Sequence, residues 1–204
     1  MKIAVLADDH SYQELISLSD QIIWFMADDF NSWIQNTNAD LLINLNDNAC
    51  FEDYHGSSMP IIINSVSESL KDQNHPVNVV RINGWHGFLK RTSWELAGNL
   101  SNTHQLLLEK LNIKSCLLPD ESGFVTARII AMIINEAYFA KEQQVSTENE
   151  IDIAMKLGTN YPKGPFEWAN EIGKKNILDL LLKLSNTDKR YQPSALLIKE
   201  APIK

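Results

Sequence analysis

The first 55 residues of the chain contain no glycine, although glycine is the residue that lets a backbone turn tightly against a bound phosphate. Cysteine is also scarce, and Cys50 and Cys116 are too few for a disulfide scaffold and show no metal-ligand spacing. No apolar run reaches the roughly 18 residues that cross a bilayer, and the opening MKIAVLADD lacks the basic region of a signal peptide. We therefore expect a cytoplasmic protein that does not contact membranes.

Positive charge is limited as well. Lysine and arginine number 18 against 26 acidic residues, which gives a formal net charge of -8. This balance argues against a general basic surface for nucleic acid, so no nucleic-acid partner is expected.

The histidines show no ligand spacing such as H-x-x-x-H at His10, His55, His75 and His104. The sequence therefore predicts no metal site.

Short apolar runs recur through the first half of the chain. They are separated by polar or helical stretches and cover residues 2–7, 21–25, 40–45, 60–64 and 77–82. Buried strands of a parallel sheet have this character, because helices cover both of their faces. The pattern predicts an α/β domain with a small parallel sheet.

The second half of the chain is predicted to be helical. Residues 123–141 carry apolar side chains on more than one helical face, which indicates a helix buried on most sides. Thr147 begins a capping box for the next helix, which Gly158 can end. Pro165 suits the first turn of a further helix, and Gly173 marks its end.

The ordered motifs of this half resemble the C-terminal domain of the 3-hydroxyacyl-CoA dehydrogenases, which include the 3-hydroxybutyryl-CoA dehydrogenases. The resemblance implies a reduced Rossmann-like domain over residues 1–118 and an all-helical dimerisation domain over residues 119–204, with a homodimer formed through the C-terminal helices. It rests on Asp120, Gly123-Phe124-Val125, Arg128, Asn135-Glu136-Ala137, Asp152, Ala154-Met155, Gly158 and the string YPKGPFE at residues 161–167.

The family reaction implied by this resemblance is the NAD-dependent oxidation of a 3-hydroxyacyl-CoA to a 3-oxoacyl-CoA. The string NGWHGF resembles the family segment that holds the catalytic base, which assigns that role to His86. Histidine suits the task because its pKa lies near neutrality and a carboxylate can orient its ring. The resemblance makes Glu95 the orienting carboxylate, if three residues are deleted, and places Asn64, Ser65 and Ser67 near the substrate.

The chain departs from the family pattern where cofactor and substrate bind. The first strand is followed by Ala7-Asp8-Asp9-His10 in place of a glycine-rich loop, and two carboxylates repel a pyrophosphate. The asparagines expected near the substrate carbonyl fall on Leu89 and Ala127, and losing one such donor costs on the order of 3 kcal/mol of transition-state stabilisation. NAD is the cofactor by resemblance, but these departures predict impaired or lost dehydrogenase activity.

Three functions are open at this point. The first is a divergent dehydrogenase with His86 as base and Glu95 as orienting group. The second is a non-catalytic dimer that binds an acyl-CoA or serves in assembly, since the helical motifs are retained while the glycine loop is not. The third is a cofactor-independent acid/base enzyme of the 3-hydroxybutyryl-CoA epimerase type.

Overall fold

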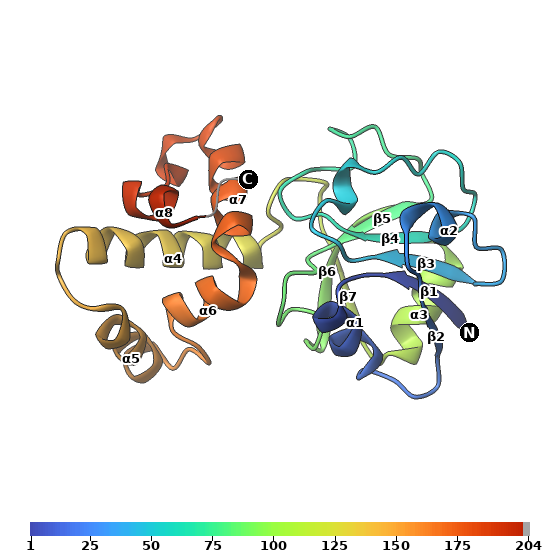
Figure 1. The fold of residues 1–204 in the computed structure, drawn as a ribbon, viewed down its shortest axis with the longest axis horizontal. Coiled ribbons are helices and arrows are strands. Elements are labelled where there is room, and N and C mark those ends of the chain that lie inside the picture. The colour runs from blue at the N-terminus through green and yellow to red at the C-terminus, as the bar shows by residue number, and fades with distance from the viewer. Residues whose placement is uncertain (202–204) are drawn as a thin grey trace. The chain divides into compact units, whose positions relative to one another are not determined.

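A computed structural model describes residues 1–201 of the chain, which form two compact units, one covering Met1–Phe124 and one beginning at Val125 (Figure 1). The first unit is α/β and the second is helical. Their strands and helices are β1 (Lys2–Leu6), α1 (Asp9–Ile16), β2 (Ile23–Met26), α2 (Phe30–Ile34), β3 (Leu41–Asn44), β4 (Ile61–Asn64), β5 (Val79–Ile82), β6 (Ser93–Gly98), α3 (Asn102–Lys110), β7 (Lys114–Leu117), α4 (Thr126–Glu142), α5 (Glu148–Thr159), α6 (Pro165–Ile172), α7 (Lys174–Ser185) and α8 (Ala195–Glu200).

The first unit is built on a seven-stranded sheet of order β2-β1-β3-β4-β5-β6-β7. Neighbouring strands are parallel except for the antiparallel pair β5 and β6. Each of the five predicted apolar runs overlaps one of the strands β1 to β5, whereas β6 and β7 were not predicted. The α/β fold class with a mostly parallel sheet is therefore confirmed.

The strand order shows how the first unit differs from a full dinucleotide-binding domain. A doubly wound dinucleotide-binding sheet has the order 3-2-1-4-5-6. The order β2-β1-β3-β4-β5 corresponds to 2-1-4-5-6 of that scheme, with the outermost strand absent and β2 at the edge. Ile23 and Phe25 of the edge strand β2 are more than 40% exposed, as expected where no further strand covers this edge.

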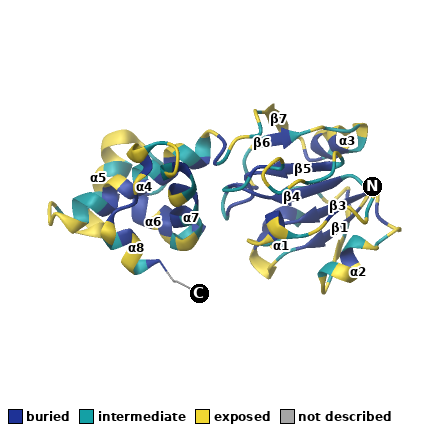
Figure 2. Cartoon of the chain, turned by 90° about the horizontal axis from the view of Figure 1, so that it is seen from above, coloured by how far each residue is buried: buried dark blue, intermediate teal, exposed yellow. Residues whose placement is uncertain are grey.

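Alternate side chains along the strands form two separate cores, one on each face of the sheet. Ile3 and Val5 of β1 pack with α1 and α3, whereas Ala4 and Leu6 pack with Trp33 of α2 (Figure 1). Every residue of β3, β4 and β5 is buried, as Figure 2 shows for the centre of the sheet. Burial on both faces accounts for the continuous apolar runs of these strands.

A buried arginine secures the end of the first unit. The Arg81 side chain is 0% exposed; its Nε donates to Asp120 Oδ1 at 2.5 Å and its Nη2 donates to the Glu121 carbonyl at 2.7 Å. Its guanidinium carbon also lies 4.2 Å from the centroid of the Phe124 ring. These contacts attach residues 120–124 to β5, so the compact first unit extends to Phe124.

Most of the helix ends predicted for the second unit are confirmed. Thr147 caps α5 in a capping box, and Pro165 occupies the first turn of α6. The expected end of α5 at Gly158 is wrong, because the helix continues to Thr159 and Asn160 takes the left-handed conformation that closes it. Helix α4 is also less enclosed than expected, since Ile129 is 53% exposed. Within residues 1–201 no helix is long and apolar enough to cross a membrane.

Motif residues of the helical unit make structural contacts. Asp152 accepts hydrogen bonds from the backbone N–H groups of Phe166 and Glu167 at 2.8 and 3.2 Å, which satisfies the first turn of α6. Asn135 donates to the Gln192 carbonyl and accepts from the Ser194 N–H, both at 2.9 Å. These side chains join segments that are 14 to 59 residues apart.

Two glycines of this unit provide a matched stability test. A β-carbon at Gly164 would overlap the Asp152 carboxylate, whereas one at Gly158 would meet nothing within 4 Å. We predict that Gly164→Ala destabilises the protein by about 1–3 kcal/mol through overpacking. Gly158→Ala should stabilise it by about 0.5–1 kcal/mol, because alanine is the better helix former. Urea unfolding monitored by circular dichroism would measure both, and equal effects of the two variants would contradict the prediction.

Candidate functional site

The turn between β1 and α1 lies at the carboxyl edge of the parallel sheet. Asp8 is the N-cap of α1, and its Oδ1 accepts the backbone N–H of Ser11 at 2.8 Å while its Oδ2 accepts the Ser11 hydroxyl at 2.9 Å. The free amides at a helix N-terminus attract an anion. In this chain the anion at that position is the carboxylate of Asp8.

The environment of Asp8 favours its charged form. Partial burial raises the pKa of this carboxyl, but the Ser11 hydrogen bonds and the nearby His86 lower it by more, so the pKa of Asp8 lies below its ordinary value of 3.8. Asp8 is consequently ionised at neutral pH. A fixed negative charge therefore stands at the start of α1.

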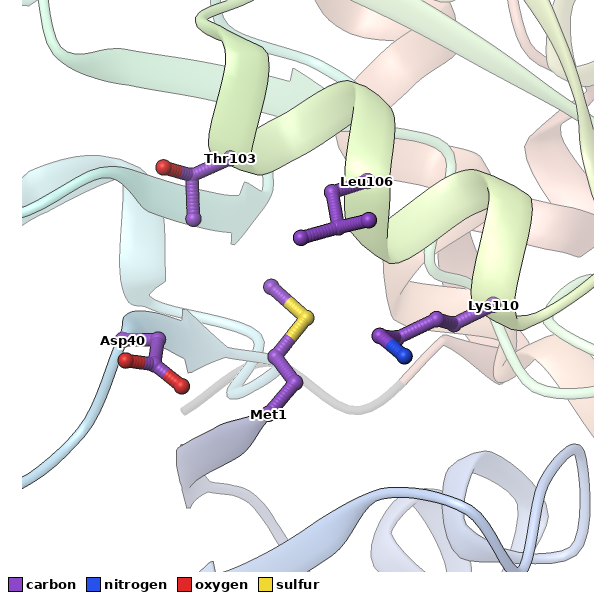
Figure 3. A pocket seen from close by; sticks show the side chains of 5 residues that line it. All are labelled: Met1, Asp40, Thr103, Leu106 and Lys110. Atoms are coloured by element: carbon purple, nitrogen blue, oxygen red, sulfur yellow. The ribbon is translucent and has the colours of Figure 1, made fainter.

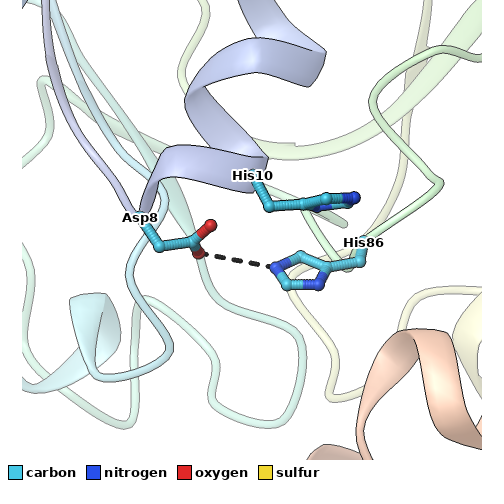
Figure 4. A group of neighbouring side chains, drawn as sticks. All are labelled: Asp8, His10 and His86. Carbon is cyan, nitrogen blue, oxygen red and sulfur yellow. Dashed lines mark hydrogen bonds and ion pairs between the residues drawn. The ribbon is translucent and has the colours of Figure 1, made fainter.

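His86, the catalytic base predicted from the resemblance, lies opposite Asp8 in the loop that follows β5. Its Nε2 is 3.4 Å from Asp8 Oδ2, and its side chain is 36% exposed. The ring of His10, in the first turn of α1, is tilted by 44° over that of His86 with 4.5 Å between centroids (Figure 4). The structure thus brings together three side chains from two segments that are 78 residues apart.

The loop that carries His86 is anchored to α1. The buried carboxylate of Glu14 accepts the backbone N–H of Gly87 at 3.1 Å and that of Lys90 at 3.2 Å. Trp85 and Phe88 of the same loop are buried as well. These contacts hold the loop in register with the β1–α1 turn, so the position of His86 over Asp8 is determined by the fold.

Glu95, the predicted partner of His86, lies on β6. Its Oε2 accepts a hydrogen bond from Asn83 Nδ2 at 3.4 Å, and its carbonyl accepts the Asn83 N–H at the same distance. The carboxylate that the structure places beside His86 is Asp8. The role assigned to Glu95 stays a prediction, and sequence spacing gave no sign that Asp8 would pair with His86.

The predicted substrate residues lie after β4. Asn64 is buried; its Oδ1 accepts the Gly84 N–H at 3.1 Å and its Nδ2 donates to the Leu45 carbonyl at 3.4 Å. Ser65 donates its hydroxyl to the Glu68 carbonyl at 2.7 Å. Ser67 is half-buried. Asn64 and Ser65 therefore stabilise the turn, and their predicted contact with substrate stays a prediction.

A hollow of about 330 Å³ lies at the opposite edge of the sheet, next to the amino ends of β1 and β3 (Figure 3). Ligands of open α/β sheets bind outside the carboxyl ends of the strands, and none of the predicted site residues lines this hollow. We therefore assign it no function. Its lining residues are Met1, Asp40, Thr103, Leu106 and Lys110.

Comparison with known proteins identifies the helical unit. Residues 123–201 match the family model of the 3-hydroxyacyl-CoA dehydrogenase C-terminal domain. Over 86 residues the chain is 43% identical to 3-hydroxyadipyl-CoA dehydrogenase of Escherichia coli K12. This alignment covers 41% of this chain and 18% of that protein. Over 92 residues it is 36% identical to 3-hydroxybutyryl-CoA dehydrogenase of Bradyrhizobium diazoefficiens. That alignment covers 44% of this chain and 31% of the relative.

The likeness in fold extends over almost the whole chain. The crystal structure of (S)-3-hydroxybutyryl-CoA dehydrogenase from Ralstonia eutropha aligns with a TM-score of 0.72 at 18% identity, covering 97% of this chain and 92% of that one. The match of residues 123–201 to the C-terminal domain of the 3-hydroxyacyl-CoA dehydrogenases confirms the resemblance predicted from the motifs. The chain spans less than a third of the length of the two curated relatives described above, 18% and 31%.

The anchor of the His86 loop yields a stability prediction. Glu14→Ala leaves two N–H groups without their acceptor, and a buried unsatisfied donor costs about 1–3 kcal/mol. We predict that this variant unfolds at lower urea than the wild type, and that Glu14→Gln, which keeps one acceptor oxygen, falls between the two. The control is Glu109→Ala, at an exposed position on α3. Glu14→Ala with unchanged stability would show that the loop does not depend on this anchor.

Proposed function

We propose that this chain is a 3-hydroxyacyl-CoA dehydrogenase-like protein in which NAD-dependent oxidation of 3-hydroxyacyl-CoA is impaired or lost. The observation that supports the proposal is the carboxylate of Asp8 at the N-terminus of α1. The family relationship supplies the reaction from which the chain would have diverged. We also propose that the protein is located in the cytoplasm.

The residues of the β1–α1 turn do not fit the pyrophosphate of a dinucleotide. A pyrophosphate in this fold binds the free amides at the start of the first helix, where glycine permits its close approach. Here Asp8 already accepts the Ser11 N–H at 2.8 Å, and Asp9 follows with a second carboxylate. An incoming pyrophosphate would have to displace a like charge from its hydrogen bonds. We accordingly derive no reaction step through NAD.

Two further positions support impaired chemistry. The family asparagines expected beside the substrate carbonyl fall on Leu89 and Ala127, which are 1% and 0% exposed and have no side-chain donor. His86 as base, with Glu95 as orienting group, is retained only as the divergent-dehydrogenase alternative. The Asp8–His86 pair, at 3.4 Å, would also suit the other alternative, an epimerase-type acid/base reaction without a cofactor.

A titration with NADH tests the loss of cofactor binding. We predict no saturable quenching of tryptophan fluorescence up to millimolar NADH, with or without acetoacetyl-CoA, because Asp8 excludes the pyrophosphate. Trp85, next to His86 in sequence and buried, is a suitable reporter. The Escherichia coli 3-hydroxyadipyl-CoA dehydrogenase serves as the control for binding, and N-acetyltryptophanamide corrects for absorption by NADH. Saturable quenching at micromolar NADH would refute the proposal.

We further propose that the helical unit forms a homodimer, which binds an acyl-CoA or serves in assembly. Exposed apolar side chains of this unit support the proposal, with Ile129 on α4 at 53%, Ile153 on α5 at 44% and Leu157 on α5 at 83% exposure. Exposed apolar surface of this kind is typical of protein interfaces. Burial between two copies would remove it from water.

Light scattering with a matched pair of variants tests this dimer. We predict that the wild type is dimeric at micromolar concentration and that Leu157→Glu is monomeric, because a buried unpaired carboxylate opposes association. Val77→Glu is the control, since Val77 is 73% exposed but belongs to the first unit. A monomeric wild type, or a Leu157→Glu variant as dimeric as the wild type, would contradict the proposed interface.

A further inference from the structure

Asp8, His10 and His86 form a cluster whose composition matches a metal site. One ligand atom from each residue lies within 4.8 Å of the other two (Figure 4). The sequence indicated no such site, because His10 and His86 belong to different segments and no spacing rule joins them. Folding places them together at the carboxyl edge of the sheet, outside both apolar cores.

One distance in the cluster equals the ligand spacing of a tetrahedral metal centre. Zinc binds imidazole nitrogen and carboxylate oxygen at about 2.1 Å, which places two tetrahedral ligands about 3.4 Å apart. The separation between Asp8 Oδ2 and His86 Nε2 is 3.4 Å. A pair at the outer limit of 4.8 Å would need to close by about 1.4 Å, a movement open to side chains of which two are exposed and one is half-buried.

Surrounding contacts orient two of these three ligands. Ser11 fixes the Asp8 carboxylate with two hydrogen bonds, and Glu14 fixes the His86 loop through two backbone amides. Partners of this kind orient metal ligands and reduce the cost of assembling the site. The carboxylates of Asp8 and Asp9 also offset the positive end of the α1 dipole, which would otherwise oppose a cation.

We propose that Asp8, His10 and His86 bind one divalent transition-metal ion of the Zn²⁺ class, with the remaining coordination position open to water or to an oxygen atom of a ligand. Two imidazoles and one carboxylate suit zinc and its neighbours, whereas Mg²⁺ and Ca²⁺ require oxygen ligands. Three protein ligands leave the site open, unlike the four of a structural zinc centre. The proposal does not depend on whether the chain retains any dehydrogenase activity.

The test is isothermal titration of ZnCl₂ into the EDTA-stripped full chain. We expect one site per chain with a micromolar Kd, weakened at least tenfold in His10→Ala and in His86→Ala. Asp8→Asn should also weaken binding, although asparagine preserves the N-cap. The control is His55→Ala, because His55 is an exposed histidine that lies 3.0 Å from the carboxylate of Asp53 but belongs to no three-ligand group among residues 1–201.

Cobalt gives a second readout of the same site. Co²⁺ bound by these three residues should show the visible absorption of a four- or five-coordinate centre, and His10→Ala should abolish it. Since His10 is exposed, this variant tests the proposal even if His86→Ala fails to fold, which urea unfolding would reveal. Absence of Zn²⁺ binding to the wild type at a hundredfold excess, or wild-type affinity in both histidine variants, would overturn the proposal.

Discussion

The carboxylate of Asp8 at the N-terminus of α1 connects the start of this helix with the loop that carries His86. It accepts a hydrogen bond from the Ser11 N–H and lies 3.4 Å from Nε2 of His86. It also belongs to the cluster that Asp8 forms with His10 and His86. A helix N-terminus offers a small number of free amide donors, and one anion generally occupies them. A side chain that supplies this anion within the chain competes directly with any phosphate from solution. The same carboxylate also lies beside the imidazole of His86, which places an acid and a base together at the surface.

The sheet explains why these groups meet. Strands β1 and β5 are separated by β3 and β4, so a loop that leaves β5 must cross the carboxyl edge to reach the β1–α1 turn. Glu14 receives that loop through the amides of Gly87 and Lys90. The buried carboxylate is thus a positioning residue for His86 although it does not touch the imidazole. Glu14 carries no sequence signal of this role, because its partners are backbone groups 73 and 76 residues away.

Local signals predicted the structure well where each element carries its own pattern. The runs that became β1 to β5 are apolar on both faces, and Thr147 with Glu150 forms the capping box expected for α5. Strand β7 was missed because all four of its residues, KSCL, are exposed at the sheet edge and carry no burial pattern. The Asp8–His86 pair was missed for another reason. Its geometry results from strand order and from the Glu14 anchor, and neither can be read from spacing along the chain.

The two units also differ in what their family motifs do physically. In the helical unit Asp152 caps α6, Asn135 ties α4 to the segment before α8, and Gly164 leaves room for the Asp152 carboxylate. A chain that must fold this unit needs these residues whether or not it catalyses any reaction. Leu89 and Ala127, where the resemblance predicts two carbonyl-binding asparagines, are buried apolar residues of the core. The matched residues 123–201 therefore account for the helical architecture, whereas Asp8, His10 and His86, the side chains suited to chemistry, lie at the carboxyl edge of the sheet.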